Sequence, residues 1–275
     1  MKEKNLKKTL NLNELKLILI YKNIKLIYKT MKSIYLAIFI IVFIMILISS
    51  YYLLNIPTNN LNKKNKLFYS INEIEPKLNS INKIKKKILE ETIQVYKNNL
   101  CTGWAEWPEK ELYLESDSDG WKIFPFYAFG VWVQSNCELC PVITNFIKSI
   151  PGLKLATLSR LKGGTKLEEH EGWASHSNYV IRCHYGLIVP DNQCYIYVRD
   201  NANNKEEKKY HSKFEWVVFD DSKIHYAHNQ SNEDRIVLIL DIARPVNIEV
   251  GKSDIGDSKE LLDIIEYFKQ KNIDL

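Results

Sequence analysis

The sequence has few cysteines, and their number and spacing exclude two kinds of cross-linked domain. The chain has five cysteines among 275 residues, so not all of them can pair internally. The one close pair is Cys137 and Cys140, and no second Cys-x-x-Cys is present. A structural zinc site built from four cysteines is therefore not expected. An internal repeat is also absent, which excludes a helical-repeat array.

A net positive charge is found only in the N-terminal part of the chain. The formal net charge is +5, but residues 1–33 hold nine Lys and two Glu, so the remaining chain carries 29 basic and 31 acidic residues. We find no basic patch interleaved with aromatic residues after residue 33. The composition therefore argues against a nucleic-acid partner.

A long apolar run follows the basic tail. Residues 34–54 contain no charged side chain and are long enough to cross about 30 Å of hydrocarbon as a helix. A buried core helix or a cleaved signal peptide is less consistent with this length and its flanks. We predict a single-pass membrane protein whose residues 1–33 form a basic cytoplasmic tail, by the positive-inside rule, although Lys63, Lys64 and Lys66 oppose it. The rest of the chain then lies in a lumen, such as that of the endoplasmic reticulum, or outside the cell.

After the apolar run, residues 55–100 are predicted to form a linker and a stem helix, because apolar residues recur at helical spacing over residues 75–96. Residues 101–250 have a different texture, with short β-branched and aromatic runs punctuated by Gly, Pro, Asn or Asp. These runs predict strands over 121–134, 154–160, 179–190, 195–200, 215–220 and 235–243, and one helix over 141–150. The expected fold is mainly β, an antiparallel sandwich or jelly roll with flanking helices. Residues 251–275 are expected to end in a helix that caps the domain.

The chemically versatile side chains concentrate in this β-rich region. All six His lie between residues 170 and 228, which raises the hypothesis of a metal site. A zinc-protease motif is excluded, because His176 follows His170 by six positions instead of the four that one helical face requires. On a strand, Arg182 and His184 point to one face. Arg235 opens the apolar run of residues 235–240, where it must either meet an anion or stay at the end of the strand. An interior with two His ligands and two Arg suits a metal together with a small dicarboxylate.

Several ordered blocks resemble the aspartyl/asparaginyl β-hydroxylase family. They are residues 107–109 (WPE), 120–125 (GWKIFP), 159–172 (SRLKGGTKLEEHEG), 181–190 (IRCHYGLIVP), 219–225 (FDDSKIH) and Arg235. The resemblance covers about residues 100–245. It implies a double-stranded β-helix, which is a jelly roll, holding Fe(II).

The resemblance also implies a role for individual residues. His170 and His225 match the two iron ligands of the family. The residues that match the groups binding the co-substrate 2-oxoglutarate are Ser159, Arg182, His184 and Arg235. Trp121 matches an aromatic residue of the pocket. His176, His211 and His228 match no functional position.

The implied activity is hydroxylation by dioxygen, with 2-oxoglutarate converted to succinate. The usual third iron ligand, a carboxylate two positions after the first His, is Gly172 here. Animal-type peptide hydroxylases of the family also lack it and hold water there, whereas bacterial lipid-hydroxylating relatives have Asp. Glu171 points away from His170 if the segment is extended, and a role for Glu169 or Glu171 stays open.

The expected substrate is an Asp/Asn-type side chain of a peptide or protein in the lumen. Lipid or small-molecule hydroxylation by the same iron site is the alternative, and a non-catalytic jelly-roll binding domain and a structural membrane protein are further rivals. The resemblance also suggests a disulfide between Cys137 and Cys140, in a loop beside the cleft.

Overall fold

The structure is a computed structural model. It describes residues 20–32, 35, 38, 39, 41–45, 66–98, 101–113, 119–202 and 204–257, and single positions up to residue 270. The chain divides into two compact units, Met1–Asn62 and Lys63–Leu275. In the first unit the described residues are helical. Within the part of the chain that is described, we find no helix long and apolar enough to span a bilayer. Most of the apolar run of residues 34–54 lies outside the described residues, so the membrane span stays a prediction.

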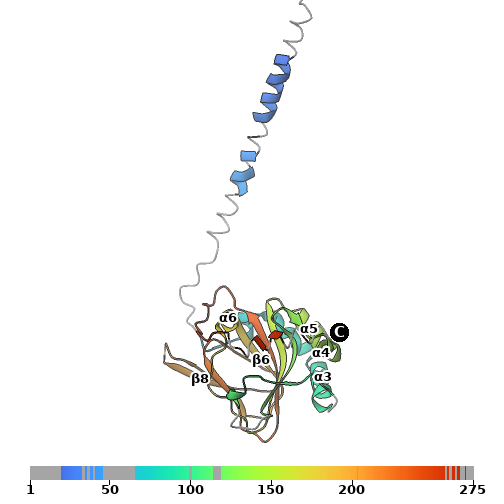
Figure 1. The fold of residues 1–275 in the computed structure, drawn as a ribbon, viewed down its shortest axis with the longest axis vertical. Helices are drawn as coiled ribbons and strands as arrows, with labels where there is room; N and C mark the ends of the chain where they lie inside the picture. The colour runs from blue at the N-terminus through green and yellow to red at the C-terminus, as the bar shows by residue number, and fades with distance from the viewer. Residues whose placement is uncertain are drawn as a thin grey trace, which may run out of the picture. The chain divides into compact units, whose positions relative to one another are not determined.

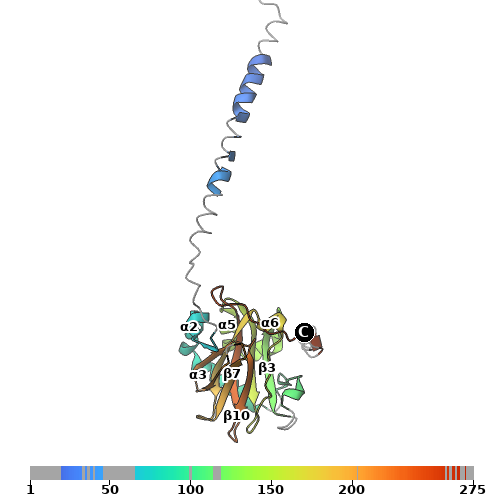
Figure 2. The same ribbon diagram turned by 90° about the vertical axis from the view of Figure 1, so that its left-hand side faces the viewer.

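Two antiparallel sheets form the second unit. The larger, sheet A, has the strand order β1 (Phe68–Tyr69), β9 (Trp216–Phe219), β6 (Val180–Ile188), β11 (Arg235–Ala243), β5 (Leu153–Leu161), β3 (Trp121–Ala128) and β2 (Ala105–Glu106), with β4 (Val131–Trp132) also paired to β3. The smaller, sheet B, has the order β10 (Ile224–Asn229), β7 (Cys194–Asp200), β8 (Lys205–Tyr210). Figure 2 shows β7 and β10 side by side.

The chain alternates between the two sheets in the manner of a double-stranded β-helix. Isolated bridges from Lys166 to His228 and from His170 to His225 add residues 166–170 to sheet B beside β10. The chain therefore passes from β5 in sheet A to this segment in sheet B, returns to β6, and crosses again to β7 and β8. The predicted mainly β fold is confirmed in this arrangement. A buried cluster with members on both sheets, including Leu161, Ile196 and Val217, fills the space between them.

Helices cover the other face of sheet A. They are α2 (Ile71–Ile74), η1 (Pro76–Lys83), α3 (Lys85–Lys97), α4 (Gln134–Leu139) and α5 (Pro141–Lys148), whereas α6 (Ala174–Ser177) and η2 (Lys110–Leu112) lie in loops. Figure 1 shows α3, α4 and α5 together on one side of β6, with β8 on the other side. The main core forms here, where Leu78 and Ile88 pack with Ile143, Leu158 and Leu238.

The predicted stem helix is part of this core, and it is not one continuous helix. A 3-10 segment, η1, precedes α3, and the two meet at Ile84. Glu91 links α3 to α5. Its carboxylate accepts hydrogen bonds from the backbone N–H groups of Val142 (2.7 Å) and Ile143 (2.9 Å) at the start of α5. These N–H groups have no partner inside their own helix.

The predicted disulfide between Cys137 and Cys140 is wrong for this structure. All five cysteines are free thiols. Cys137 lies in α4 and Cys140 between α4 and α5, and both pack in the main core instead of forming a loop beside the cleft. Burial raises the pKa of both thiols. At the C-terminus, the described positions 259, 262, 263, 265, 266 and 270 are helical, and Ile265 packs against a small cluster that includes Trp173.

Candidate functional site

Two histidines of sheet B form the centre of the site. His170 and His225 are directly opposed, and their backbones exchange hydrogen bonds of 3.1 and 2.9 Å. Opposed residues project their side chains to the same face, and the ring centroids are 4.4 Å apart. His225 is buried and faces sheet A, where its ring contacts Phe219.

The backbone fixes which nitrogen of each ring carries the proton. His170 Nδ1 lies 2.8 Å from Glu168 O, and His225 Nδ1 lies 2.7 Å from Lys223 O. Because a carbonyl oxygen only accepts, each Nδ1 donates and each Nε2 keeps its lone pair. Desolvation inside the domain is the largest cause of the low pKa of both rings, about 3 for His170 and about 4 for His225. Two neutral imidazoles with unprotonated Nε2 atoms and carbonyl-bound Nδ1 atoms have the donor chemistry that a transition metal requires.

A carboxylate to which the sequence patterns assign no role lies beside this pair. Asp221, in the turn between β9 and β10, is buried, and its Oδ1 is 3.3 Å from His225 Nε2. Burial is the largest cause that raises the pKa of Asp221. Its neighbour Asp220 shapes the turn by accepting hydrogen bonds from Ser222 N (3.1 Å) and Ser222 Oγ (2.6 Å). No group of three or more His, Cys, Asp or Glu side chains converges tightly enough to hold a metal by itself within the described residues.

The position of Asp221 explains why residue 172 is glycine. A Cβ atom on Gly172 would lie 2.3 Å from Asp221 Oδ2 and 2.7 Å from Ser177 Cβ. Neither of the two glutamates left open as ligands takes this place. Glu169 pairs with Arg199 on the surface, and Glu171 lies near Ser253 and Asp254. In this chain the carboxylate nearest to the two histidines therefore comes from the turn, and not from the segment that carries His170.

Arg182 holds Asp221 in place. Its guanidinium makes a two-pronged contact with Asp241, with Nε and Nη2 each 2.8 Å from a carboxylate oxygen, and its Nη1 lies 2.5 Å from Asp221 Oδ1. Asp241 also accepts a 2.8 Å hydrogen bond from His176 Nε2. Arg182 points into the site as predicted, but its donors already face two carboxylates.

Arg235 has a different environment, because no described residue provides a counter-ion for its charge. The side chain is 2% exposed, and its Nε and Nη1 atoms have no hydrogen-bond partner among the described residues. Its Nη2 lies 3.5 Å from Ser159 Oγ, which in turn accepts a 3.0 Å hydrogen bond from Trp121 Nε1. Burial lowers the pKa of Arg235 to about 10. A buried guanidinium without a partner is costly unless an anion completes it.

His184 lies on the same face of β6 as Arg182, and Cys183 packs in the helical core on the opposite face. His184 Nδ1 is 3.2 Å from Nε2 of His211, a residue that matched no functional position of the family. The structure thus brings together all the predicted site residues. Ser159, Trp121, Arg182, His184 and Arg235 come from sheet A, and His170 and His225 come from sheet B.

An apolar cleft opens beside Arg182. Three tryptophans form one wall of the cleft, where Trp107 stacks between Trp121 (ring centroids 4.5 Å apart) and Trp173 (6.0 Å). The remaining lining residues are Ile123, Pro125, Tyr127, Phe129, Leu155, Ala156, Thr157, His176, Arg182 and Ile239. The walls of the cleft are therefore mostly aromatic and aliphatic.

A sequence model of the aspartyl/asparaginyl beta-hydroxylase family matches residues 83–245. The chain belongs to this family. The match contains both histidines, both arginines, Ser159 and Asp221, and it confirms the family that the sequence blocks predicted. The description of the family is that of hydroxylases, the class of enzyme that the sequence blocks predicted.

Two curated relatives have different printed activities. The ornithine lipid ester-linked acyl 2-hydroxylase of Rhizobium tropici is 34% identical over 128 residues, which are 46% of this chain and 42% of that protein. The aspartate beta-hydroxylase domain-containing protein 2 of Xenopus tropicalis is 31% identical over 158 residues, which are 50% of this chain and 40% of that protein. The chain thus spans less than half the length of each relative. Among solved structures, a prolyl hydroxylase from Trichoplax adhaerens, in complex with a peptide fragment, aligns with a TM-score of 0.40 and 14% identity, over 59% of this chain and 79% of that one.

Proposed function

We propose that this chain is an Fe(II)- and 2-oxoglutarate-dependent hydroxylase. The observation that carries the proposal is the buried guanidinium of Arg235, which has no counter-ion among the described residues, together with two histidines whose Nδ1 atoms donate to backbone carbonyls and whose Nε2 atoms are therefore unprotonated. A dicarboxylate that reaches from the histidine pair to Arg235 would supply the missing negative charge. Charge-assisted contacts of this kind are among the strongest hydrogen bonds in proteins.

The residues of the site then take complementary roles. His170 and His225 would hold the iron through Nε2, and the carbonyls of Glu168 and Lys223 keep both rings in the required tautomer. Bound Fe(II) would supply the activation of dioxygen, with 2-oxoglutarate as the source of two electrons through loss of carbon dioxide. Arg235 and Ser159 bind the far carboxylate of the co-substrate. We assign to Arg182 the task of holding Asp221 beside His225, since its donors already face Asp221 and Asp241.

The test of this function uses the full chain. Formation of succinate from 2-oxoglutarate is measured with Fe(II) and dioxygen, and bound iron is measured separately. We expect one iron per chain, and we expect His170→Ala and His225→Ala to abolish both iron binding and succinate formation. The matched control is His228→Ala, because His228 lies on the same strand as His225 but on the outer face, where it contacts Tyr195. The proposal fails if both site variants turn over 2-oxoglutarate like the parent.

Two substrate classes are proposed for this site. The family and the Xenopus relative favour an Asp/Asn-type side chain of a peptide or protein. The cleft favours the second class, an acyl chain of a lipid, because its walls are aromatic and aliphatic and its one guanidinium, Arg182, is already paired with two carboxylates. The Rhizobium relative supports this second class. A gain of one oxygen atom, sought by mass spectrometry in both proteins and extracted lipids of cells with and without this chain, separates the two.

We also propose that residues 34–54 anchor the chain in a membrane, with the basic tail in the cytoplasm and residues 55–275 in a lumen or outside the cell. The absence of charge over 21 residues and the nine preceding lysines support this topology. Protease protection of an N-terminal tag in sealed microsomes would contradict it. Residues 229–231 (NQS) form a sequon for N-glycosylation. It is not a useful reporter of topology, because Asn229 is fully buried and donates to Leu161 O and Glu233 O.

A further inference from the structure

An ion pair with little exposure to water lies at the end of sheet B from which His225 projects. The ladder between β10 and β7 ends at the pair Ile224 and Arg199, so Lys223 and Asp200 come next on the two strands. Lys223 Nζ is 2.5 Å from Asp200 Oδ2. The two side chains are 10% and 8% exposed, so their charges are largely removed from water.

The backbone of the same lysine holds the ring of His225. Lys223 O accepts the Nδ1–H of His225 at 2.7 Å, and this hydrogen bond leaves Nε2 unprotonated. The Lys223 N–H donates to Asp220 O at 3.1 Å, so Lys223 also belongs to the turn that carries Asp221. A shift of Lys223 would therefore disturb both the His225 ring and the carboxylate beside it.

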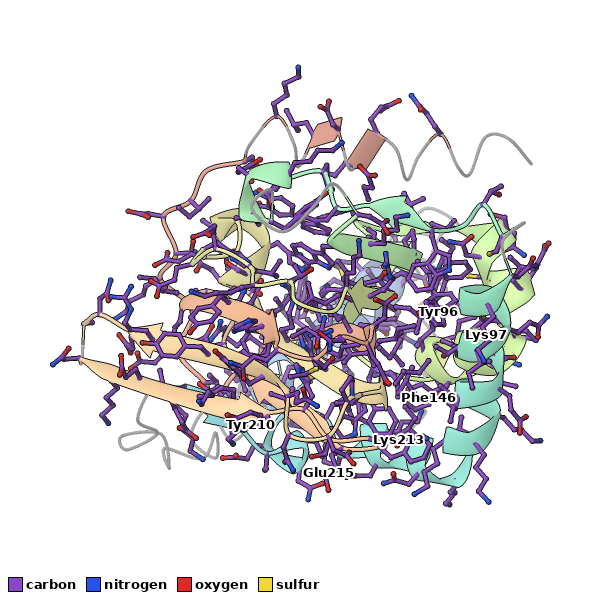
Figure 3. All side chains as sticks on the ribbon, turned by 90° about the horizontal axis from the view of Figure 1, so that it is seen from below. Tyr96, Lys97, Phe146, Tyr210, Lys213 and Glu215 are labelled. Atoms are coloured by element: carbon purple, nitrogen blue, oxygen red, sulfur yellow. The ribbon has the colours of Figure 1, made fainter. Side chains whose placement is uncertain are left out.

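Asp200 is itself fixed where β7 turns into β8. Its second carboxylate oxygen, Oδ1, accepts a hydrogen bond of 3.0 Å from the N–H of Ala202 in this turn. Asp200 pairs with Lys205 at this end of the two strands, whereas Tyr210, labelled in Figure 3, lies at the other end of β8. The carboxylate is therefore a fixed point for the lysine that faces it.

The other histidine of the pair is supported in a different way. His170 Nδ1 donates to Glu168 O, and the Glu168 N–H donates to Leu112 O at 2.8 Å. A backbone hydrogen bond to a separate segment thus supports the residue that holds His170. At His225 the corresponding residue, Lys223, is tied to a neighbouring strand by its side chain.

A pair of this kind restrains the backbone on which it stands. Removal of one partner leaves the other charge poorly solvated, which is costly, so the Lys223 side chain remains with Asp200. Groups that orient a metal-binding imidazole through its second nitrogen commonly change metal affinity 10–100-fold when they are lost. The ion pair stands one covalent step behind such a group, the Lys223 carbonyl.

We propose that Asp200 is a positioning residue for His225, because its ion pair with Lys223 fixes the carbonyl that keeps Nε2 of His225 unprotonated and holds the ring in one orientation. The metal at Nε2 rests on the proposed function. The restraint on the ring stands on the contacts of Asp200, Lys223 and His225 alone.

The first measurement is the affinity for a redox-inert metal. Calorimetry gives the dissociation constant of Zn(II) for the untagged full chain in detergent, and His225→Ala identifies the binding that belongs to this site. We expect Asp200→Asn and Lys223→Met each to weaken zinc binding by about tenfold or more. The double variant should bind no more weakly than the weaker single variant, because both remove one interaction. Lys223→Arg keeps the ion pair and should stay within about threefold of the parent.

Asp234→Asn is the matched control for loss of a buried ion pair. Asp234 lies 2.5 Å from Arg160, and their side chains are 17% and 10% exposed. This variant should lose stability in thermal unfolding but keep its zinc affinity within about twofold of the parent. Unchanged affinity in Asp200→Asn and Lys223→Met overturns the proposal, and so does an equal loss of affinity in Asp234→Asn.

The second measurement reads the His225 ring in the absence of metal. The full chain with ¹⁵N-labelled histidine gives long-range proton–nitrogen spectra that show which ring nitrogen carries the proton, and His225→Gln identifies the signals of His225. We expect protonation at Nδ1 alone in the parent and in Lys223→Arg, and a mixture of the two tautomers in Lys223→Met. The parental spectrum in Lys223→Met overturns the proposal.

The two measurements keep this inference apart from the proposed function. A parent that binds no zinc through His225 overturns the proposed function and, with it, the role of Asp200 in metal binding. The ring-nitrogen spectrum is recorded without metal, so it still decides whether the ion pair fixes the tautomer of His225.

Discussion

At the scale of single residues, the most informative feature is a charge without a partner. Arg235 begins the central strand β11, is buried, and has no counter-ion among the described residues. Its pKa, lowered to about 10 by burial, indicates that the folded protein carries a penalty of about 3 kcal/mol for keeping this charge. Functional sites commonly contain such destabilising groups, which the ligand then satisfies.

This penalty gives a prediction in which stability and function move in opposite directions. Arg235→Met removes the unpaired charge and preserves most of the volume, so we expect the variant without ligand to be at least as stable as the parent. The parent should gain about 2.7 kcal/mol at a 2-oxoglutarate concentration 100 times its Kd, whereas Arg235→Met should gain nothing. Thermal unfolding under anaerobic Fe(II), with and without co-substrate, measures both effects.

Arg235→Lys is the matched control for this experiment. It keeps the charge but loses the planar fork of donors, so we expect the apparent KM for 2-oxoglutarate to rise about tenfold or more. A loss of several kcal/mol in unliganded Arg235→Met would mean that the guanidinium has a partner in the protein. An unchanged KM with a lowered kcat in Arg235→Lys would assign the residue another role.

Residue patterns predicted the separate site residues but not two of the contacts between them. His170, His225, Arg182 and Arg235 stand in recognisable blocks, and the alternation of a strand places Arg182 and His184 on one face. Asp221 and His211 were given no role, because each contacts a site residue on another element, and the sequence does not show that contact. The clash between a Cβ at position 172 and Asp221 also depends on tertiary structure, so Gly172 appeared in the sequence only as a missing ligand.

At the scale of elements, one side chain links two helices of the layer that covers sheet A. Glu91 is buried on α3 and accepts two backbone N–H groups at the first turn of α5. A carboxylate in this position satisfies unpaired donors and interacts favourably with the helix dipole. The contact fixes α5, whose Ile143 and Ile147 fill the main core behind the site.

We therefore expect Glu91→Ala to reduce the free energy of unfolding by about 1–3 kcal/mol. Glu90→Ala is the matched control, because Glu90 is exposed on the same helix, and it should change stability by less than about 0.5 kcal/mol. Urea denaturation followed by tryptophan fluorescence measures both variants. Equal effects of the two substitutions would show that the cap does not contribute.

The elements that were predicted are those that bury apolar side chains. The strands β3, β5, β6, β7, β9 and β11 and the helix α5 follow from β-branched or amphipathic runs. The strand β8 was missed because its sequence, KEEKKY, lies at the exposed edge of sheet B, where charged residues limit unwanted strand pairing. The strand β10 was missed because the residues of its buried face, His225, Ala227 and Asn229, are small or polar instead of large and apolar.

At the scale of the whole molecule, buried neutral histidines determine how the free energy of unfolding changes as the pH is lowered. His184 and His211 have pKa values well below the 6.5 of an unfolded chain, because they are desolvated and Arg235 is close to both; Arg182 and His225 also act on His184. His170 and His225 shift in the same direction. Between pH 5 and 6.5 the unfolded chain therefore binds more protons than the folded protein.

The sign of the pH dependence follows from this difference. Stability rises with pH wherever the unfolded state binds more protons. The contribution of these histidines to the free energy of unfolding should therefore be complete above about pH 6.5 and should decrease as the solution is acidified toward pH 5. The His184–His211 pair alone contributes a slope that approaches about 2.7 kcal/mol per pH unit once both rings are protonated in the unfolded chain.

All six tryptophans lie between residues 104 and 216. Urea denaturation of the metal-free full chain, followed by tryptophan fluorescence, therefore reports on the second unit alone. His211→Leu removes one of the two protons and should flatten the slope by up to about 1.4 kcal/mol per pH unit. A parent stability that stays level or increases between pH 6.5 and 5 would show that these rings titrate in the folded protein as they do in the unfolded chain.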